Sequence, residues 1–272
     1  MRVRIRHATV YRYDRPINYA IQLVRLTPCD HAGQRTLWWR VVEAPARPLP
    51  ESDDGYGNVV NMLTIRRPHG EATVIAEGEV ETVDTHGVLR GAVERLPAAY
   101  FRRGSAITEP DAALAELAST ASGAGDAIER LHRLAQTIAG RVVYEHGTTS
   151  VLTTASEALA RGRGVCQDHA HVFIACARVL EFPARYVSGY LWEGPRNTPG
   201  TAGHAWAEAY VDGFGWVGFD PANGVCPTDA YVRVAIGLDY QEAAPIRGLR
   251  RGPGDETLAV SVEVQQVHAQ QQ

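Results

Sequence analysis

The chain has 272 residues, of which 45% are hydrophobic and 21% charged, and its formal net charge is -4 at pH 7. This length suits one large domain or two modest ones, and the composition is ordinary for a soluble globular protein. The charge balance excludes the broad basic surface that nucleic-acid binding requires, so we expect no nucleic-acid partner.

The sequence carries no signal for a membrane or an oxidising compartment. No run of about 18 apolar residues occurs, so we expect no membrane-spanning helix and no membrane partner. The segment from Met1 to His7 alternates charged and apolar residues and lacks the apolar core and cleavage site of a signal peptide. We therefore expect a cytoplasmic protein. The four cysteines form no C-x-x-C pair, which argues against a zinc ribbon or a thioredoxin-like site.

The first hundred residues have the patterning of β-strands. Val3, Ile5 and His7 alternate with arginines, and a turn signal rich in Asp and Gly occupies residues 53–58. Several short strands at this spacing predict an antiparallel, sandwich-like domain over residues 1–100. Beyond the first strand, the strands that we expect are 22–27, 37–43, 58–65 and 71–83.

Helical patterning begins after residue 100 and gives way to strands near residue 184. Asp126 is a plausible N-cap of the second helix, and apolar residues recur at helical spacing in the fourth. We expect a catalytic domain over residues 101–250, followed by a C-terminal strand and tail over 251–272; a return of that strand to the N-terminal domain is left open. The expected helices are 111–119, 126–139, 156–160 and 166–180, and the expected strands are 185–190, 205–211 and 216–219.

A cysteine opens the fourth helix directly after a glycine-rich turn, in the sequence Gly-Arg-Gly-Val-Cys-Gln-Asp over residues 162–168. The helix dipole and the unpaired N–H groups of a first turn favour the thiolate form of Cys166, and the thiolate is the nucleophile. The backbone N–H of Cys166 is also placed to face an oxyanion. A buried structural cysteine that happens to begin a helix is the alternative interpretation.

A histidine and an aspartate complete the pattern. His204 begins one expected strand, and Asp220 ends the next. A hairpin between these strands would bring Asp220 beside His204, where it could orient the ring and stabilise the imidazolium. A lone histidine or aspartate is more often structural, but three roles filled in a compatible arrangement favour a catalytic triad.

Three motifs in this order resemble the transglutaminase-like superfamily: G-R-G-V-C-Q-D, G-H-A-W-A-E-A-Y and G-W-V-G-F-D-P-A-N-G, between residues 162 and 224. The resemblance implies a nucleophile at Cys166, a general base and acid at His204 and an orienting carboxylate at Asp220. The β-rich first hundred residues, the segment 185–190 and the ending over 247–264 resemble the bacterial branch with its own N-terminal β-domain. The implied fold class is α+β, a β-sandwich-like N-terminal domain followed by a papain-like, transglutaminase-core catalytic domain.

Supporting roles are less specific. Tyr144 is a candidate oxyanion donor or a core tyrosine, and Gln167 either lines the pocket or caps the helix. A metal set of His169, His171 and His204 is weighed and rejected, because helical neighbours two residues apart point away from each other and a thiol triad needs no metal. We expect no metal and no cofactor.

The triad alone does not choose between water and an amine as acyl acceptor. We favour protease- or amidase-like hydrolysis of a peptide or protein substrate, since the chain has no acidic D-x-D-x-D calcium loop. Amine transfer to protein glutamine and a non-catalytic binding module remain alternatives, whereas a glycan-removing amidase would carry C-x-x-C pairs. Residues 192–202 are a hypothetical lid, and the oligomeric state stays open.

Overall fold

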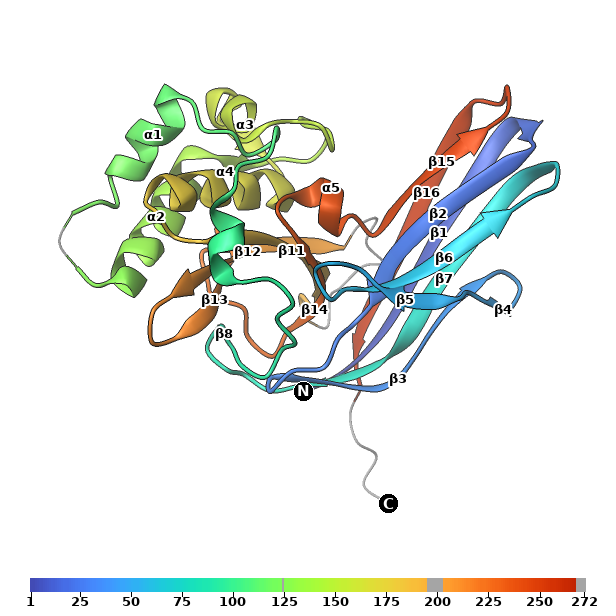
Figure 1. Cartoon of the computed structure of the whole chain (residues 1–272), viewed down its shortest axis with the longest axis horizontal. Helices are drawn as coiled ribbons and strands as arrows, with labels where there is room; N and C mark the ends of the chain where they lie inside the picture. Colours follow the sequence, from blue (N-terminus) through green and yellow to red (C-terminus); the bar gives the residue numbers. More distant parts are fainter. Residues whose placement is uncertain (124, 195–202, 268–272) are drawn as a thin grey trace, which may run out of the picture.

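The computed structural model describes residues 1–123, 125–194 and 203–267, which form a β-rich region and a mixed helix-and-sheet region side by side (Figure 1). This is the α+β class expected from the sequence. Within these described ranges, no helix is long and apolar enough to cross a membrane.

The β-rich region consists of two antiparallel sheets that share one hydrophobic core. Alternation along the strands explains this packing: in β1, every second side chain from Val3 to Tyr13 is buried. The first sheet has the order β16-β1-β7-β3-β4 and the second β15-β2-β6-β5. The strands are β1 (Arg2–Ile17), β2 (Tyr19–Thr27), β3 (Gln34–Glu43), β4 (Arg47–Pro48), β5 (Glu51–Asp53), β6 (Val59–Ile65), β7 (His69–Thr82), β15 (Ile246–Arg251) and β16 (Glu256–Gln266).

The last two described strands, β15 and β16, lie in the sheets of the N-terminal region. Strand β16 pairs with β1, with Val262 opposite His7, and β15 pairs with β2, with Ile246 opposite Val24. The mixed region is thus inserted between strands of the β-rich region, and its position is constrained at both ends.

The mixed region is built on a five-stranded antiparallel sheet of order β14-β11-β12-β13-β8. Strand β8 lies within the first hundred residues, but its two residues pair with Trp216 and Val217 of β13. So short a strand leaves no periodicity in the sequence. The strands are β8 (Val88–Leu89), β11 (Ala184–Leu191), β12 (His204–Val211), β13 (Gly215–Phe219) and β14 (Tyr231–Gly237).

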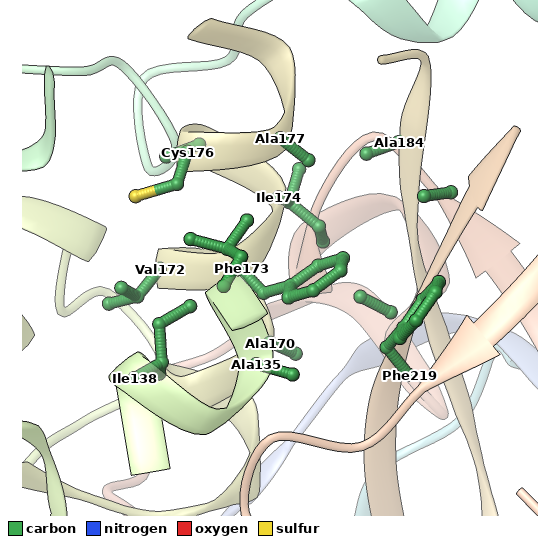
Figure 2. Packing of buried hydrophobic residues seen from close by; sticks show 14 of the residues in the cluster. Ala135, Ile138, Ala170, Val172, Phe173, Ile174, Cys176, Ala177, Ala184 and Phe219 are labelled. Carbon is green, nitrogen blue, oxygen red and sulfur yellow. The ribbon is translucent and has the colours of Figure 1, made fainter. Parts of the chain in front are cut away.

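Helix α4 (Cys166–Val179) packs on this sheet and against the three other main helices, with its apolar side chains in the core (Figure 2). Phe173 stacks on Phe219 of β13 with ring centroids 5.2 Å apart, and every residue from Gln167 to Ala177 is buried. The four main helices match the expected ones within two residues at each end. The remaining elements are η1 (Ala98–Arg102), α1 (Ala112–Ser119), α2 (Ala127–Arg141), β9 (Val143–Tyr144), α3 (Ala155–Arg161), β10 (Arg163–Gly164) and α5 (Tyr240–Ala243).

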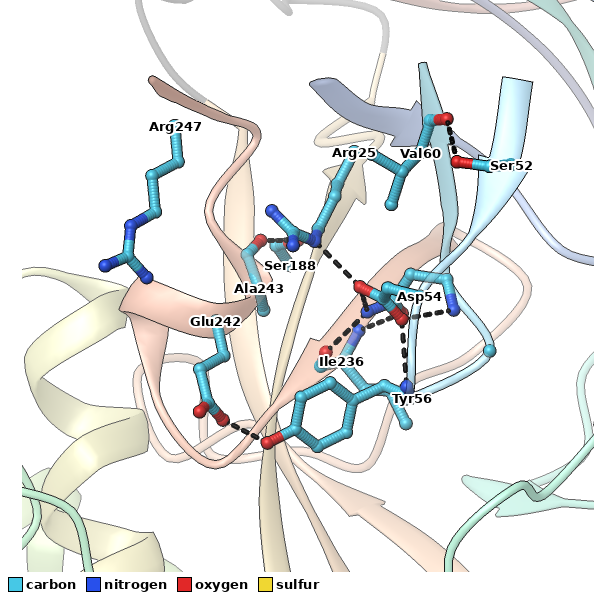
Figure 3. A network of polar contacts seen from close by, with 12 residues as sticks. Arg25, Ser52, Asp54, Tyr56, Val60, Ser188, Ile236, Glu242, Ala243 and Arg247 are labelled. Atoms are coloured by element: carbon cyan, nitrogen blue, oxygen red, sulfur yellow. Dashed lines mark hydrogen bonds and ion pairs between the residues drawn. The ribbon is translucent and has the colours of Figure 1, made fainter. Parts of the chain in front are cut away.

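Polar contacts join the two regions along β14 and α5 (Figure 3). The side chain of Asn58 exchanges two 2.8 Å hydrogen bonds with the backbone of Ile236, and Tyr56 donates to Glu242. Asp54 accepts from the backbone N–H groups of Tyr56 and Asn58, which holds this turn in place. Because these groups are largely buried and satisfied, they fix the orientation of the β-rich region against the sheet that carries the candidate site.

Candidate active site

Cys166 is the first residue of α4, at the end of a tight connection from α3. Gly162 ends α3 in the left-handed conformation, with φ of 64°, which favours glycine. Residues Arg163 and Gly164 then pair in parallel with Val143 and Tyr144. The connection therefore presents Cys166 at the positive end of the helix dipole, where the first N–H groups lack partners within the helix.

Asp168 anchors this connection from inside. Its Oδ2 accepts 2.7 Å hydrogen bonds from the backbone N–H of Val165 and from the hydroxyl of Thr149. The carboxyl packs so closely over Gly164 that a Cβ there would lie 2.6 Å from Oδ2. Sequence analysis assigned this aspartate no such role; its position three residues after the N-cap was the available signal.

His204 and Asp220 lie together as the expected hairpin requires. Strand β12 begins at His204 and pairs with β13, and Asp220 follows the last residue of β13. Nε2 of His204 is 2.6 Å from Oδ2 of Asp220. Cys166 lines the same cleft as this histidine, and its interaction with the ring contributes to raising the pKa of His204. The structure thus brings together all three residues that the motifs singled out.

The Asp220 carboxylate is fully buried and held by several donors. The Tyr231 hydroxyl donates to Oδ2 at 2.8 Å and the Asn223 side chain at 2.7 Å, while Oδ1 accepts from the backbone N–H groups of Ala222 and Asn223. Sequence reasoning missed Tyr231 and Asn223. Asn223 lies inside the third motif, but nothing in the sequence places Tyr231, on β14, beside this carboxylate.

The contacts of His204 and Asp220 favour the imidazolium form of the histidine and the carboxylate form of the aspartate. Burial, the largest single influence, lowers the pKa of His204, but its contacts with Asp220 and Cys166 outweigh burial and raise the pKa to about 10. Burial likewise raises the pKa of Asp220, and the bonds from His204, Asn223 and Tyr231 together lower it. The histidine is therefore an imidazolium near neutral pH, suited to stabilising a thiolate.

The two supporting candidates lie at the same place. Tyr144 is 44% exposed, which excludes a core position, and its hydroxyl is close enough to Cys166 to interact with it electrostatically. Burial of the hydroxyl and the neighbouring Cys166 raise the pKa of Tyr144 to about 12, so the hydroxyl remains a donor at neutral pH. Gln167 lines the cleft beside Cys166, while the cap of α4 is supplied by Asp168.

The cleft at Cys166 and His204 has a volume of about 280 Å³. It lies where β1 and β16 of the β-rich region face the mixed region. Most of the hypothetical lid, residues 195–202, lies outside the described residues.

The other three cysteines lie in different surroundings. All four are free thiols. Burial raises the pKa of Cys176 to about 12 and that of Cys226 to about 11, and it also raises the pKa of Cys29. These three thiols are protonated at neutral pH, and none of them lines the cleft that contains Cys166.

The histidines once weighed as a metal set make other contacts. The ring nitrogens of His169 lie 2.9 and 2.8 Å from the carbonyl oxygens of Val165 and Val142. His171 accepts a hydrogen bond from the backbone N–H of Tyr240. No group of metal-ligating side chains occurs among the residues that the structure describes.

Comparison with known proteins agrees with this geometry. Residues 115–221 match the Transglutaminase-like superfamily, and residues 3–81 match the Bacterial transglutaminase-like N-terminal region. The uncharacterized protein ML0607 of Mycobacterium leprae (strain TN) is 34% identical over 279 residues, which cover 97% of this chain and 98% of that protein. The chain belongs to the transglutaminase-like superfamily, as its motifs predicted.

Two further proteins are similar to this chain over nearly its whole length. The uncharacterized protein Rv2569c of Mycobacterium tuberculosis (strain ATCC 25618 / H37Rv) is 31% identical over 291 residues, covering 97% of this chain and 92% of that protein. The crystal structure of a candidate cysteine protease from Cytophaga hutchinsonii superposes with a TM-score of 0.77 at 21% identity, over 99% of this chain and 92% of that one. Both regions therefore share the fold of that protein.

Proposed function

We propose that this chain is a cysteine-dependent amide-bond enzyme that acts through an acyl-thioester. Cys166 is the nucleophile, His204 the general base and acid, and Asp220 the carboxylate that orients the histidine. The observation that carries the proposal is the 2.6 Å contact of His204 Nε2 with Asp220, because it leaves Nδ1 as the ring nitrogen available to the thiol.

The first half of the reaction forms the thioester. In the starting ion pair His204 already holds the proton of the Cys166 thiol, and the thiolate attacks the amide carbonyl carbon, which becomes a tetrahedral oxyanion. We assign the backbone N–H of Cys166 and the hydroxyl of Tyr144 as its donors. When the carbonyl re-forms, the C–N bond breaks, and His204 gives its proton to the departing nitrogen.

The second half releases the acyl group. His204, now neutral, takes a proton from water, and the resulting hydroxide attacks the thioester carbonyl. The C–S bond breaks, and Cys166 leaves as a thiolate beside the imidazolium. The net change is hydrolysis of an amide to an acid and an amine.

Hydrolysis is the favoured outcome, and amine transfer is the second candidate. Similarity in fold to the candidate cysteine protease of Cytophaga hutchinsonii supports hydrolysis, and membership of the transglutaminase-like superfamily supports transfer. In a transferase, an amine would take the place of water in the second half and an amide would be formed. A peptide or protein carrying an amide is the substrate class in either case.

The test incubates wild type and Cys166→Ala with a peptide library, with and without an added primary amine, and identifies products by mass spectrometry. We expect hydrolysed peptides that are absent with the variant; amine-linked products would establish transfer instead. Cys226→Ala is the matched control and should retain activity, because its thiol is held protonated outside the site.

A parallel measurement does not depend on finding the substrate. Iodoacetamide should alkylate Cys166 much faster than Cys29, Cys176 or Cys226, and His204→Ala should remove this advantage. Alkylation of Cys166 at the rate of an ordinary exposed cysteine, with no turnover, would instead favour a non-catalytic binding module.

A further inference from the structure

The cleft beside Cys166 is bounded by both regions of the molecule. On one side are Cys166 and His204 from the mixed region. On the other are side chains of β1 and β16, among them Tyr11 and Leu258. Residues of the β-rich region thus lie against the reacting thiol, although they are about 90 to 155 positions away in the sequence.

The contribution of the β-rich region is a continuous surface. In the antiparallel register, Tyr11 lies opposite Leu258, and Thr9 lies opposite Val260. Since side chains two apart on a strand share a face, these four residues form two adjacent cross-strand pairs on one face of the sheet. All four line the cleft. This surface, Thr9, Tyr11, Leu258 and Val260, is called the β-wall below.

The described lining of the cleft contains no acidic side chain and no basic one other than histidine. Among the described residues that line it, none is Asp, Glu, Lys or Arg. Burial lowers the pKa of His7, which also lines the cleft, to about 4, so this ring is neutral at pH 7. The imidazolium of His204 is therefore the charged group of the described lining.

Several polar groups of the lining are already paired. His7 contacts the hydroxyls of Tyr190 and Thr9 at 3.1 and 3.2 Å, and the Ser188 hydroxyl donates to the carbonyl of Ala243. An incoming polar side chain would have to displace these contacts. A cationic side chain would also lose water without gaining an opposite charge, and an anionic one would meet only the imidazolium of His204, which is already paired with Asp220.

We propose that the β-wall forms one side of the acyl-group pocket and selects substrates whose side chain next to the reacting amide is uncharged and apolar or aromatic. This inference rests on the proposed function and deepens it by naming the substrate class. The volume of about 280 Å³ suits one or two residues rather than a long peptide. The exposed side chain of Leu258 gives the wall an apolar rim.

The test measures alkylation of Cys166 by N-acetylated chloromethyl ketones of Phe, Leu, Asp and Lys. The thiolate displaces chloride and forms a thioether, which intact mass spectrometry counts, and Cys166→Ala supplies the blank. Each rate is divided by that of the same reagent with free cysteine, which removes differences in intrinsic reactivity. We expect the Phe and Leu reagents to react at least about tenfold faster than the charged ones, as apolar pockets discriminate on this scale.

Variants that place a charge on the β-wall test whether this surface produces the preference among the reagents. Leu258→Glu should raise the rate of the Lys reagent relative to the Asp reagent several-fold, and Leu258→Arg should do the reverse. The matched controls are Leu249→Glu and Leu249→Arg, because Leu249 is 62% exposed against 56% for Leu258 but lies outside the cleft. Neither control should change the preference. The use of two opposite charges keeps the test valid if one variant folds poorly.

The experiments distinguish an incorrect role of the β-wall from an incorrect proposed function. If iodoacetamide, which has no side chain, reacts with Cys166 no faster than with an ordinary thiol, the proposed function fails. If iodoacetamide reacts rapidly but the four reagents have equal normalised rates, the substrate class is wrong. If the preference is present but both Leu258 variants leave it unchanged, the β-wall does not produce it.

Discussion

The hydroxyl of Tyr231 donates a 2.8 Å hydrogen bond to Oδ2 of Asp220, the same oxygen that contacts Nε2 of His204. Tyr231 is on β14, an edge strand that β11 and β12 separate from β13, the strand that leads to Asp220. It does not touch the thiol in the contacts described above. Tyr231 is therefore a positioning residue that holds the carboxylate toward the histidine.

Tyr231→Phe should slow alkylation of Cys166 by iodoacetamide about tenfold, since a hydrogen bond to a charged group contributes roughly 1.5–3 kcal/mol. Hydrogen bonds to a carboxylate lower its pKa, so removing one should raise the pKa of Asp220 and move the acid limb of the rate profile to higher pH. The measurement is the alkylation rate from pH 4 to 9. If the variant has a lower melting temperature but the acid limb of its alkylation rate is unchanged, Tyr231 stabilises the fold and does not position Asp220.

Gly164→Ala should destabilise the fold and disturb the nucleophile together. The added Cβ would lie 2.6 to 2.8 Å from atoms of the Asp168 side chain, which holds the backbone N–H of Val165. Overpacking of this kind costs about 1–3 kcal/mol, and the shifted carboxylate would release the start of α4. Urea unfolding and the iodoacetamide rate of Cys166 check both effects.

Gly140→Ala is the matched control for this substitution. Gly140 lies in α2, and a Cβ there would have nothing within 4 Å. Because alanine favours the helix, the variant should be as stable as wild type or up to about 1 kcal/mol more stable. Equal unfolding free energies of the Gly164 and Gly140 variants would contradict the claim that Asp168 packs on Gly164 and holds the start of α4.

The sequence singled out Cys166, His204 and Asp220 because each lies in one of three motifs that occur in order, whereas no single signal was decisive alone. Glycines before a helix mark Cys166, and strand boundaries mark His204 and Asp220. The main helices and strands were also predictable, since their hydrophobic periodicity is strong. Whether the three residues act as a triad remains a proposal for the experiments above.

Features that depend on tertiary contacts were not predictable. Tyr231 reaches Asp220 only through the strand order of the sheet, and β8 joins that sheet with two residues. Leu258 reaches the cleft because β16 pairs with β1, which the alternation of β16 does not specify. Propensity and periodicity describe a strand but not its partner.

Glu208→Gln should be strongly destabilising because this carboxylate is buried between two guanidinium groups. It is 2.6 Å from Nε of Arg185 and 2.7 Å from Nε of Arg233. Burial raises the pKa of Glu208, but both arginines outweigh it and lower the pKa to about 2. Loss of the charge leaves buried arginines undercompensated, which costs about 3–5 kcal/mol. Urea unfolding at pH 7 measures the loss.

The control for this ion-pair network is an exposed pair. Glu71 contacts Arg12 at 3.0 Å, with 54% and 61% of the two side chains exposed. Glu71→Gln should change the unfolding free energy by less than about 1 kcal/mol, because solvent screens surface pairs. A similar loss for both variants would show that the buried network is no stronger than a surface contact.

Stability should fall in mild acid because buried histidines resist protonation. Burial, followed by the charge of Arg178, lowers the pKa of His171 to about 3, well below its unfolded value of 6.5. The unfolded chain therefore binds more protons than the native one between these values. The contribution of His171 to the free energy of unfolding is complete above about pH 6.5. Below that pH it falls by about 1.4 kcal/mol per pH unit, down to the native pKa.

His171→Gln should flatten this dependence, since glutamine does not titrate and its carbonyl can accept the hydrogen bond from the N–H of Tyr240. The comparison is the change in unfolding free energy between pH 7.5 and pH 4.5, which removes any constant cost of the substitution. We expect the wild type to lose about 3 kcal/mol more than the variant over this range. His86→Gln is the control, because that side chain is 91% exposed and should leave the curve unchanged. Parallel curves for wild type and His171→Gln would mean that the native state accommodates a protonated His171.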